Sequence, residues 1–185
     1  MASLPSSKTV TYEQWLLMPE VQDATEEVVN GEIRIMPPAK WKHQRISELI
    51  AAALRNQLGI DRYSVATGSF GLIIRKSPLT SRVPDVAVFE LATLVEQDGY
   101  INSAPQLLVE VLSPSNSRRE REEKLGDYAS IGVPEVWVVS PEARTVEVLY
   151  LEGAFLRTSQ IVASGALIPK LFPQVSVEIA KIWPD

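Results

Sequence analysis

The chain has 185 residues, of which 45% are hydrophobic and 22% are charged, and it contains no cysteine. This composition predicts one globular domain and excludes a disulfide framework or a thiolate metal site. The formal net charge of −5 excludes a protein that simply coats nucleic acid. Because no signal-peptide pattern and no run of about 18 apolar residues is present, we expect a soluble, cytoplasmic protein without a membrane partner.

The first part of the chain predicts a short helix followed by a hairpin. Thr11, with Gln14 three residues later, matches the capping-box pattern of a helix start, and a proline stops this helix soon afterwards. In the segment 26–36, the Asn30-Gly31 pair suits the positive φ values of a type I′ turn. This segment is therefore predicted to be a β-hairpin.

A longer helix and several strands follow. Apolar residues recur at helical spacing from Trp41 to Leu58, and Gly59 is well placed to be the C-cap of this helix. Strand-like segments are expected near residues 62–67, 70–76, 84–90 and 106–112.

The second half predicts a strand–helix–strand unit. Ser117 with Glu120 forms another capping-box pattern, and Gly132 is expected to end the helix. A wholly apolar strand, VPEVWVVS, follows this helix, so it should run parallel to the strand at 106–112. A second hairpin turning at Glu152-Gly153 and a proline-punctuated tail, expected to form a strand or short helix, complete the chain.

These elements define the expected fold class. It is a mixed α/β sheet with the order helix, three strands, helix, strand (αβββαβ), flanked by helices and extended by β-hairpins at both ends. We expect one domain over 1–185, with a core at about 27–173 and an N-terminal helical extension at 1–26.

Two acids stand in strands whose other residues are apolar. Glu110 lies in LLVEVLSP, where alternation puts it on one face with Leu108 and Leu112. Since both faces of this strand are apolar, the carboxylate is expected to be desolvated, with a raised pKa. It either pairs with an arginine or contributes to a metal site. Asp85, in PDVAVFE, either begins its strand or joins Glu110 in binding a hard cation such as Mg²⁺.

Lys124 is the third candidate residue. Glu120 lies four residues earlier on the same predicted helix, so the two could form an ordinary surface ion pair. However, Leu125 is adjacent and Tyr128 lies four residues later, so Lys124 borders the face that packs inward. The crossover would place this face over the strand that carries Glu110.

The residues as a set resemble the PD-(D/E)XK nuclease superfamily, whose core has the same order of elements. More closely, the chain resembles the bacterial restriction endonuclease family called Uma-two, from about Glu27 to Pro173. The stretches that carry the resemblance are EVVNGEIRIMPP followed by His43, VPDVAVFE, PQLLVEVLSPSN, EKLGDYASIGVPEVWVVSPEARTVEVL and LFP.

The resemblance implies roles for individual residues. In the superfamily an aspartate and a glutamate bind the divalent metal, and they match Asp85 and Glu110. The superfamily lysine, two positions after the glutamate, is replaced here by Leu112. The family resembles superfamily members whose lysine has moved to the following helix, and Lys124 is the residue that matches.

Further candidates are Glu27 and His43, which match family positions, and Tyr128. His43 would contact phosphate or orient a water, or it is simply a partly exposed helix histidine.

The activity implied is metal-assisted phosphodiester hydrolysis. Mg²⁺ or Mn²⁺, held by Asp85, Glu110 and the carbonyl of Val111, would polarise the phosphate and lower the pKa of a bound water. Lys124 would stabilise the developing negative charge. The partner is expected to be nucleic acid, most of all DNA. Two basic clusters would bind its phosphates: Lys40, Lys42 and Arg45 form the first, and Arg118, Arg119 and Arg121 form the second. A homodimer is expected by analogy, because cutting two strands needs two sites.

Two other interpretations remain open. The chain could be a catalytically inactive relative that keeps the fold as a nucleic-acid-binding or assembly module, which Leu112 and the negative net charge favour. Alternatively, the acids could form a purely structural network and the basic clusters an ordinary solvated surface.

Overall fold

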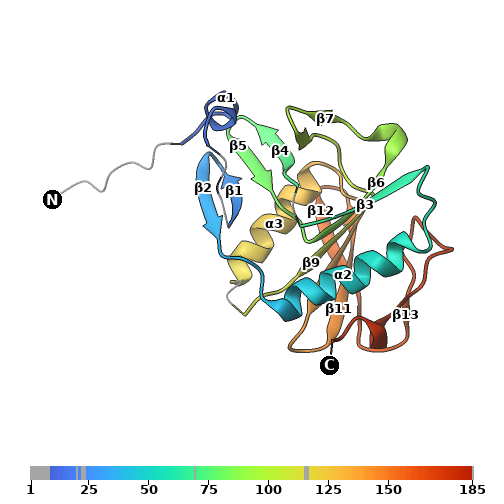
Figure 1. Cartoon of the computed structure of the whole chain (residues 1–185). Helices are drawn as coiled ribbons and strands as arrows, with labels where there is room; N and C mark the ends of the chain where they lie inside the picture. The colour runs from blue at the N-terminus through green and yellow to red at the C-terminus, as the bar shows by residue number, and fades with distance from the viewer. Residues whose placement is uncertain (1–8, 20, 22–23, 69, 115–116, 185) are drawn as a thin grey trace.

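The computed structural model describes residues 9–19, 21, 24–68, 70–114 and 117–184 (Figure 1). Its centre is a sheet that the described residues build from six strands. In spatial order these are β12 (Phe155–Val162), β11 (Thr145–Glu152), β10 (Glu135–Ser140), β9 (Leu107–Val111), β6 (Val86–Glu90) and β3 (Tyr63–Thr67). Strands β9 and β10 are parallel, as the sequence predicted, and the other neighbours are antiparallel.

Two long helices cover opposite faces of this sheet (Figure 1). Helix α2 (Trp41–Arg55) buries Ile46, Ile50 and Leu54 against one face, together with the C-terminal segment. Helix α3 (Arg118–Ser130) buries Tyr128 against the other. The order α2, β3, β6, β9, α3, β10 is the predicted αβββαβ core.

A second sheet packs over the α3 side and corrects one part of the prediction. Its strands are, in order, β2 (Glu32–Met36), β1 (Thr25–Val29), β5 (Leu79–Arg82), β4 (Leu72–Lys76), β8 (Tyr100–Ile101) and β7 (Glu96–Gln97). The segment expected near 70–76 therefore does not join the central sheet. Strands β5, β7 and β8, and the 3-10 helix η1 (Leu91–Thr93), were not predicted, because such short and polar segments carry no clear periodicity.

Most of the expected helix ends and turns are confirmed. Capping boxes at Thr11 and Ser117 begin α1 (Tyr12–Leu16) and α3. Asn30 and Gly31 have the positive φ values, 52° and 83°, of the first hairpin, and Gly132 at 82° follows α3. The tail forms β13 (Ala166–Leu167), β14 (Val177–Glu178) and the 3-10 helix η2 (Ile179–Lys181), in keeping with the expected strand or short helix.

The predicted C-cap at Gly59 is wrong. Helix α2 ends at Arg55, and its C-cap is Asn56 with a right-handed φ of −67°. The Leu58 amide still donates to the Leu54 carbonyl at 3.0 Å, so the chain leaves the helix without a left-handed residue and needs no glycine there.

No helix in the described part of the chain is both long and apolar enough to span a bilayer.

Candidate active site

Asp85 lies just before β6 and is fixed against the end of β9. Its Oδ2 atom accepts a hydrogen bond of 2.6 Å from the backbone amide of Val111. The two strands are antiparallel neighbours, with Val86 opposite Val109, which brings Asp85 beside the residues that end β9. Asp85 is thus more than the start of a strand, because its carboxylate reaches the neighbouring backbone next to Glu110.

Glu110 points to the α3 side of the central sheet, as the alternation predicted. Leu108 and Leu112 belong to the apolar cluster on that side, whereas Leu107 and Val109 belong to the cluster on the α2 side. The Glu110 side chain is only 12% exposed. Its pKa is raised to about 7. Burial makes the largest contribution and the negative charge of Asp85 adds to it, whereas the positive charge of Lys124 opposes both.

The partners of Glu110 come from α3, not from an arginine. Lys124 Nζ lies 3.2 Å from Oε2, and the Tyr128 hydroxyl donates to Oε1. The alternative in which Glu110 pairs with an arginine is therefore wrong. The surface pair of Lys124 with Glu120 is not found either, because Glu120 closes the capping box with Ser117.

Lys124 also pairs with Glu27 on β1, at 3.0 Å. Burial alone would lower the pKa of this ammonium, but the carboxylates of Glu110 and Glu27 outweigh it, so the pKa is raised and the lysine stays charged. Burial would raise the pKa of Glu27, yet the charges of Lys124 and Arg82 outweigh it and lower the pKa. Lys124 is thus a buried cation held between two carboxylates.

Sequence reasoning missed Arg82, at the end of β5. It is 2% exposed, donates to Glu27 at 2.9 Å and to Asp127 at 2.6 Å, and lies 3.5 Å from Glu123. The sequence does show an arginine three residues before Asp85, which could have pointed to a residue near the site. It was missed because β5 was not recognised as a strand. Arg82 thus links Glu27 on β1 to Asp127 on α3, the helix that also carries Lys124.

His43, on the first turn of α2, joins the same place from the opposite face of the sheet. Its Nε2 atom lies 2.8 Å from the Val111 carbonyl and 3.3 Å from Asp85 Oδ2, and both partners are acceptors, so this nitrogen carries a hydrogen. Burial would lower the pKa of His43, but the bond to Asp85 and its charge outweigh it, so the pKa is raised. The buried Nδ1 has no hydrogen-bond partner in the described structure.

The structure thus brings together Asp85, Glu110, Val111, Lys124 and His43, with the remaining candidates Glu27 and Tyr128 as direct neighbours. The donors available to a cation are the two carboxylates and one carbonyl, all of them oxygens. No group of three or more His, Cys, Asp or Glu side chains among the described residues has the spacing of a metal cage.

The two basic clusters differ in how many of their residues form ion pairs with acidic side chains. Lys40, Lys42 and Arg45 are exposed around the start of α2, and none of them forms an ion pair with a described residue. At the start of α3, Arg118 pairs with Glu122 at 2.7 Å, Arg121 pairs with Glu147, and Arg119 is exposed.

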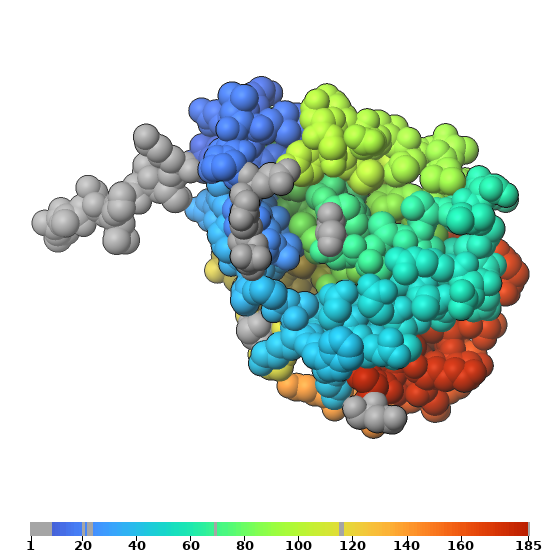
Figure 2. Space-filling model, in the orientation of Figure 1, coloured from blue at the N-terminus to red at the C-terminus, as the bar shows by residue number. Residues whose placement is uncertain are grey.

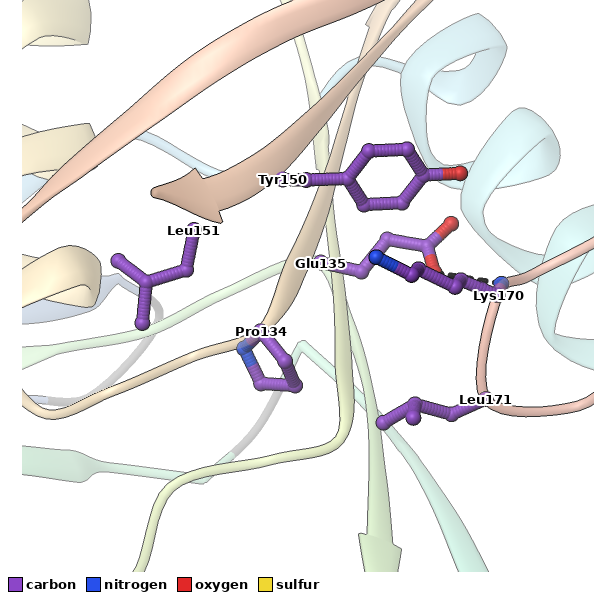
Figure 3. Close-up of a pocket in the computed structure, with 6 residues that line it drawn as sticks. All are labelled: Pro134, Glu135, Tyr150, Leu151, Lys170 and Leu171. Atoms are coloured by element: carbon purple, nitrogen blue, oxygen red, sulfur yellow. Dashed lines mark hydrogen bonds between the residues drawn. The ribbon is translucent and has the colours of Figure 1, made fainter. Parts of the chain in front are cut away.

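A second buried acid, Glu135, lies on the other face of the central sheet. Its carboxylate accepts from Trp137 Nε1 at 2.7 Å and from the Lys170 amide at 2.8 Å, and burial raises its pKa. It borders a cavity of about 140 Å³ (Figure 3), and none of the residues of the site above lines this cavity. The cavity is lined by Pro134, Glu135, Tyr150, Leu151, Lys170 and Leu171.

Comparison with known proteins identifies the family and the fold of the chain. The family model described as "Uma2: Putative restriction endonuclease" matches residues 10–180. The fold is similar to the crystal structure of a protein from Anabaena variabilis described as a putative nuclease belonging to DUF820, with a TM-score of 0.76 and 20% sequence identity over 94% of this chain and 97% of that one. No curated protein is significantly similar in sequence.

The predicted restriction-endonuclease-like α/β fold is therefore confirmed, and the chain belongs to the Uma2 family of putative restriction endonucleases.

Proposed function

We propose that the protein is a metal-dependent nuclease that hydrolyses phosphodiester bonds in nucleic acid, with DNA as its substrate. One observation carries this proposal: the buried Glu110 pairs with the Lys124 ammonium at 3.2 Å, yet its pKa is raised to about 7 by burial and by the negative charge of Asp85. A purely structural acid would be stabilised by its partners alone, whereas here a second negative charge makes ionisation more costly. Membership of the family supports the same conclusion.

The donor set fits a hard divalent cation such as Mg²⁺ or Mn²⁺. Asp85, Glu110 and the Val111 carbonyl would hold it, since such ions prefer one or two carboxylates with further oxygen ligands. When bound, the ion would polarise a phosphate and lower the pKa of a coordinated water. The imidazole of His43 contacts Asp85 Oδ2 and the Val111 carbonyl, so an ion at this place would use the lone pairs that these contacts leave free.

The other residues of the site would act on the phosphate and on each other. Lys124, which stays charged, would stabilise the negative charge that develops on the phosphate oxygens. Arg82 and Glu27 hold Lys124 in place. His43 would contact the phosphate or orient a water, and the unpaired cations at the start of α2 would hold flanking phosphates without reading their sequence.

The test is cleavage of DNA by the purified protein. Supercoiled plasmid and circular single-stranded DNA are incubated with the protein in Mg²⁺, in Mn²⁺ and in EDTA, and cleavage should require a metal. Glu110→Gln keeps the shape of the side chain but removes the charge that binds the ion, so its rate should fall by about a thousandfold or more. Circular dichroism should show an intact fold, and undiminished cleavage by this variant would exclude the assignment.

A second candidate function is a catalytically inactive nucleic-acid-binding or assembly module. The observation in its favour is that both oxygens of Glu110 already have partners, Lys124 and Tyr128, while Leu112 stands where the superfamily has its lysine. Titration calorimetry with Mn²⁺ separates the two functions, because the nuclease must bind the metal and the module need not.

A further inference from the structure

Trp41 is the first residue of α2, and 78% of its surface is exposed. The other three tryptophans, Trp15, Trp137 and Trp183, are all buried. Helix α2 runs along the surface of the molecule (Figure 2). The chain therefore exposes one of its four tryptophan rings to solvent, at the start of the helix that carries His43.

The surroundings of Trp41 are positively charged. Lys40 and Lys42 flank it in sequence, Arg45 lies one turn further on the same side, and none of them is paired with an acid of the described chain. The N-cap residue, Lys40, makes no side-chain capping bond, so the positive end of the helix dipole adds to these charges. An aromatic face surrounded by cations is complementary to a nucleic acid, which offers bases that stack and phosphates that are negative.

Trp41 shares the first turn of α2 with His43, which contacts Asp85 of the candidate active site. Two residues apart on a helix, Trp41 and His43 project to nearly opposite sides, about 10 to 12 Å apart across the helix. A strand rises about 3.4 Å per nucleotide in the duplex form, so this separation corresponds to roughly three nucleotides. A strand bound beside His43 and Asp85 can therefore continue past Lys42 to Trp41.

We propose that Trp41 stacks on an unpaired base of the substrate strand, a few nucleotides from the phosphate that is cut. The substrate class is then nucleic acid with a single-stranded segment, because both faces of a base inside a duplex are covered by its neighbours. Stacking tolerates any base, so no sequence preference follows from it. This inference rests on the proposed nuclease function and adds the strandedness of its substrate.

The first test uses the intrinsic fluorescence of the wild-type protein in EDTA, where metal-dependent cleavage cannot occur. Because the other tryptophans are buried, a quenching oligonucleotide reports mainly on Trp41. Oligothymidylate should quench the emission, whereas a hairpin duplex of the same length should quench it much less. Unchanged emission with bound oligothymidylate overturns the proposal.

The second test measures the affinity of labelled oligonucleotides by anisotropy. Trp41→Ala should weaken the binding of oligothymidylate roughly 5- to 100-fold, the range expected for the loss of one stacked base, and should change duplex binding less than about twofold. Trp41→Phe should retain most of the affinity. The matched control is Phe155→Ala, which removes another exposed aromatic, on β12, and should have no effect.

Three further results would overturn the proposal. In the first, Trp41→Ala binds oligothymidylate as tightly as the wild type. In the second, it loses equal affinity for the duplex. In the third, sedimentation shows that Trp41→Ala separates a dimer formed by the wild type, so that a second copy of the chain covers the ring. These measurements need no cleavage, so they can refute the role of Trp41 while the nuclease function stands. The Glu110→Gln assay tests the nuclease function separately.

Discussion

The two faces of the central sheet each bury one glutamate, and they stabilise it differently. On the α2 side, the carboxylate of Glu135 is held by two neutral donors, the Trp137 indole and the Lys170 amide. On the α3 side, Glu110 meets the charged Lys124, which shares its ammonium with Glu27, itself paired with Arg82. Both acids have a raised pKa because they are buried.

The charges around the two glutamates distinguish a structural role for Glu135 from the catalytic role proposed for Glu110. Two neutral hydrogen bonds and the nearby charge of Lys170 stabilise the Glu135 carboxylate, and no other carboxylate of the described chain raises its pKa, so nothing at that place calls for a further cation. Around Glu110, Asp85 adds a second negative charge just before the adjacent strand, and His43 Nε2 lies within hydrogen-bond distance of both the Asp85 carboxylate and the Val111 carbonyl. A raised pKa alone would not distinguish the two sites, whereas the charges around each carboxylate do.

The largest expected effect is on stability, and it comes from Arg82. Arg82→Met leaves Glu27 and Asp127 buried without their partner, which should lower the free energy of unfolding by about 3 to 5 kcal/mol. Urea denaturation measures the loss. Arg118→Met removes an exposed arginine of α3 that is also paired with a glutamate, and it should leave stability almost unchanged. A similarly small loss for Arg82→Met would show that the charge network is not what stabilises the α3 face.

The next effect is on catalysis, and it compares two lysines. Lys124→Met removes the ammonium next to Glu110 and should lower kcat for metal-dependent cleavage by about 10²- to 10³-fold, with a smaller change in KM. Lys170→Met removes the ammonium that lies 5.0 Å from the Tyr150 ring beside Glu135, and its activity should stay at the wild-type level. Equal activity of the two variants would remove Lys124 from the proposed mechanism.

The smallest effect is the dependence of stability on pH in the metal-free protein. The pKa of Glu110 rises from 4.5 to about 7 on folding, so the folded state binds this proton more tightly, and its contribution to stability is lost as pH rises from about 4.5 to 7. Glu110→Gln cannot ionise, so relative to the wild type it should gain up to about 3 kcal/mol between pH 4 and pH 8.

Thermal and urea unfolding in EDTA at several pH values measure this gain. Glu122→Gln, which alters an exposed glutamate on the same helix, should show no such trend. If the free energy of unfolding changes with pH in the same way in both variants, Glu110 does not have the raised pKa.

The sequence predicted the central fold well where its patterns are local. Alternation in β9 placed Glu110 on the α3 side, and the two capping boxes gave the starts of α1 and α3. Strand β5 was missed because Leu79–Arg82 has no apolar alternation. Its residues are buried through contacts with the adjacent strand β4 and with β1, which lies far away in the chain. Arg82 was missed with it.

The sequence by itself determined the elements of the central core and the face of β9 that carries an acid, because hydrophobic period and capping depend on neighbours within a few residues. Only the tertiary structure decided the partners of that acid. Lys124, Glu27, Arg82 and His43 meet around β9 from separate elements, and the charge and hydration of each group depend on distances that no local pattern encodes.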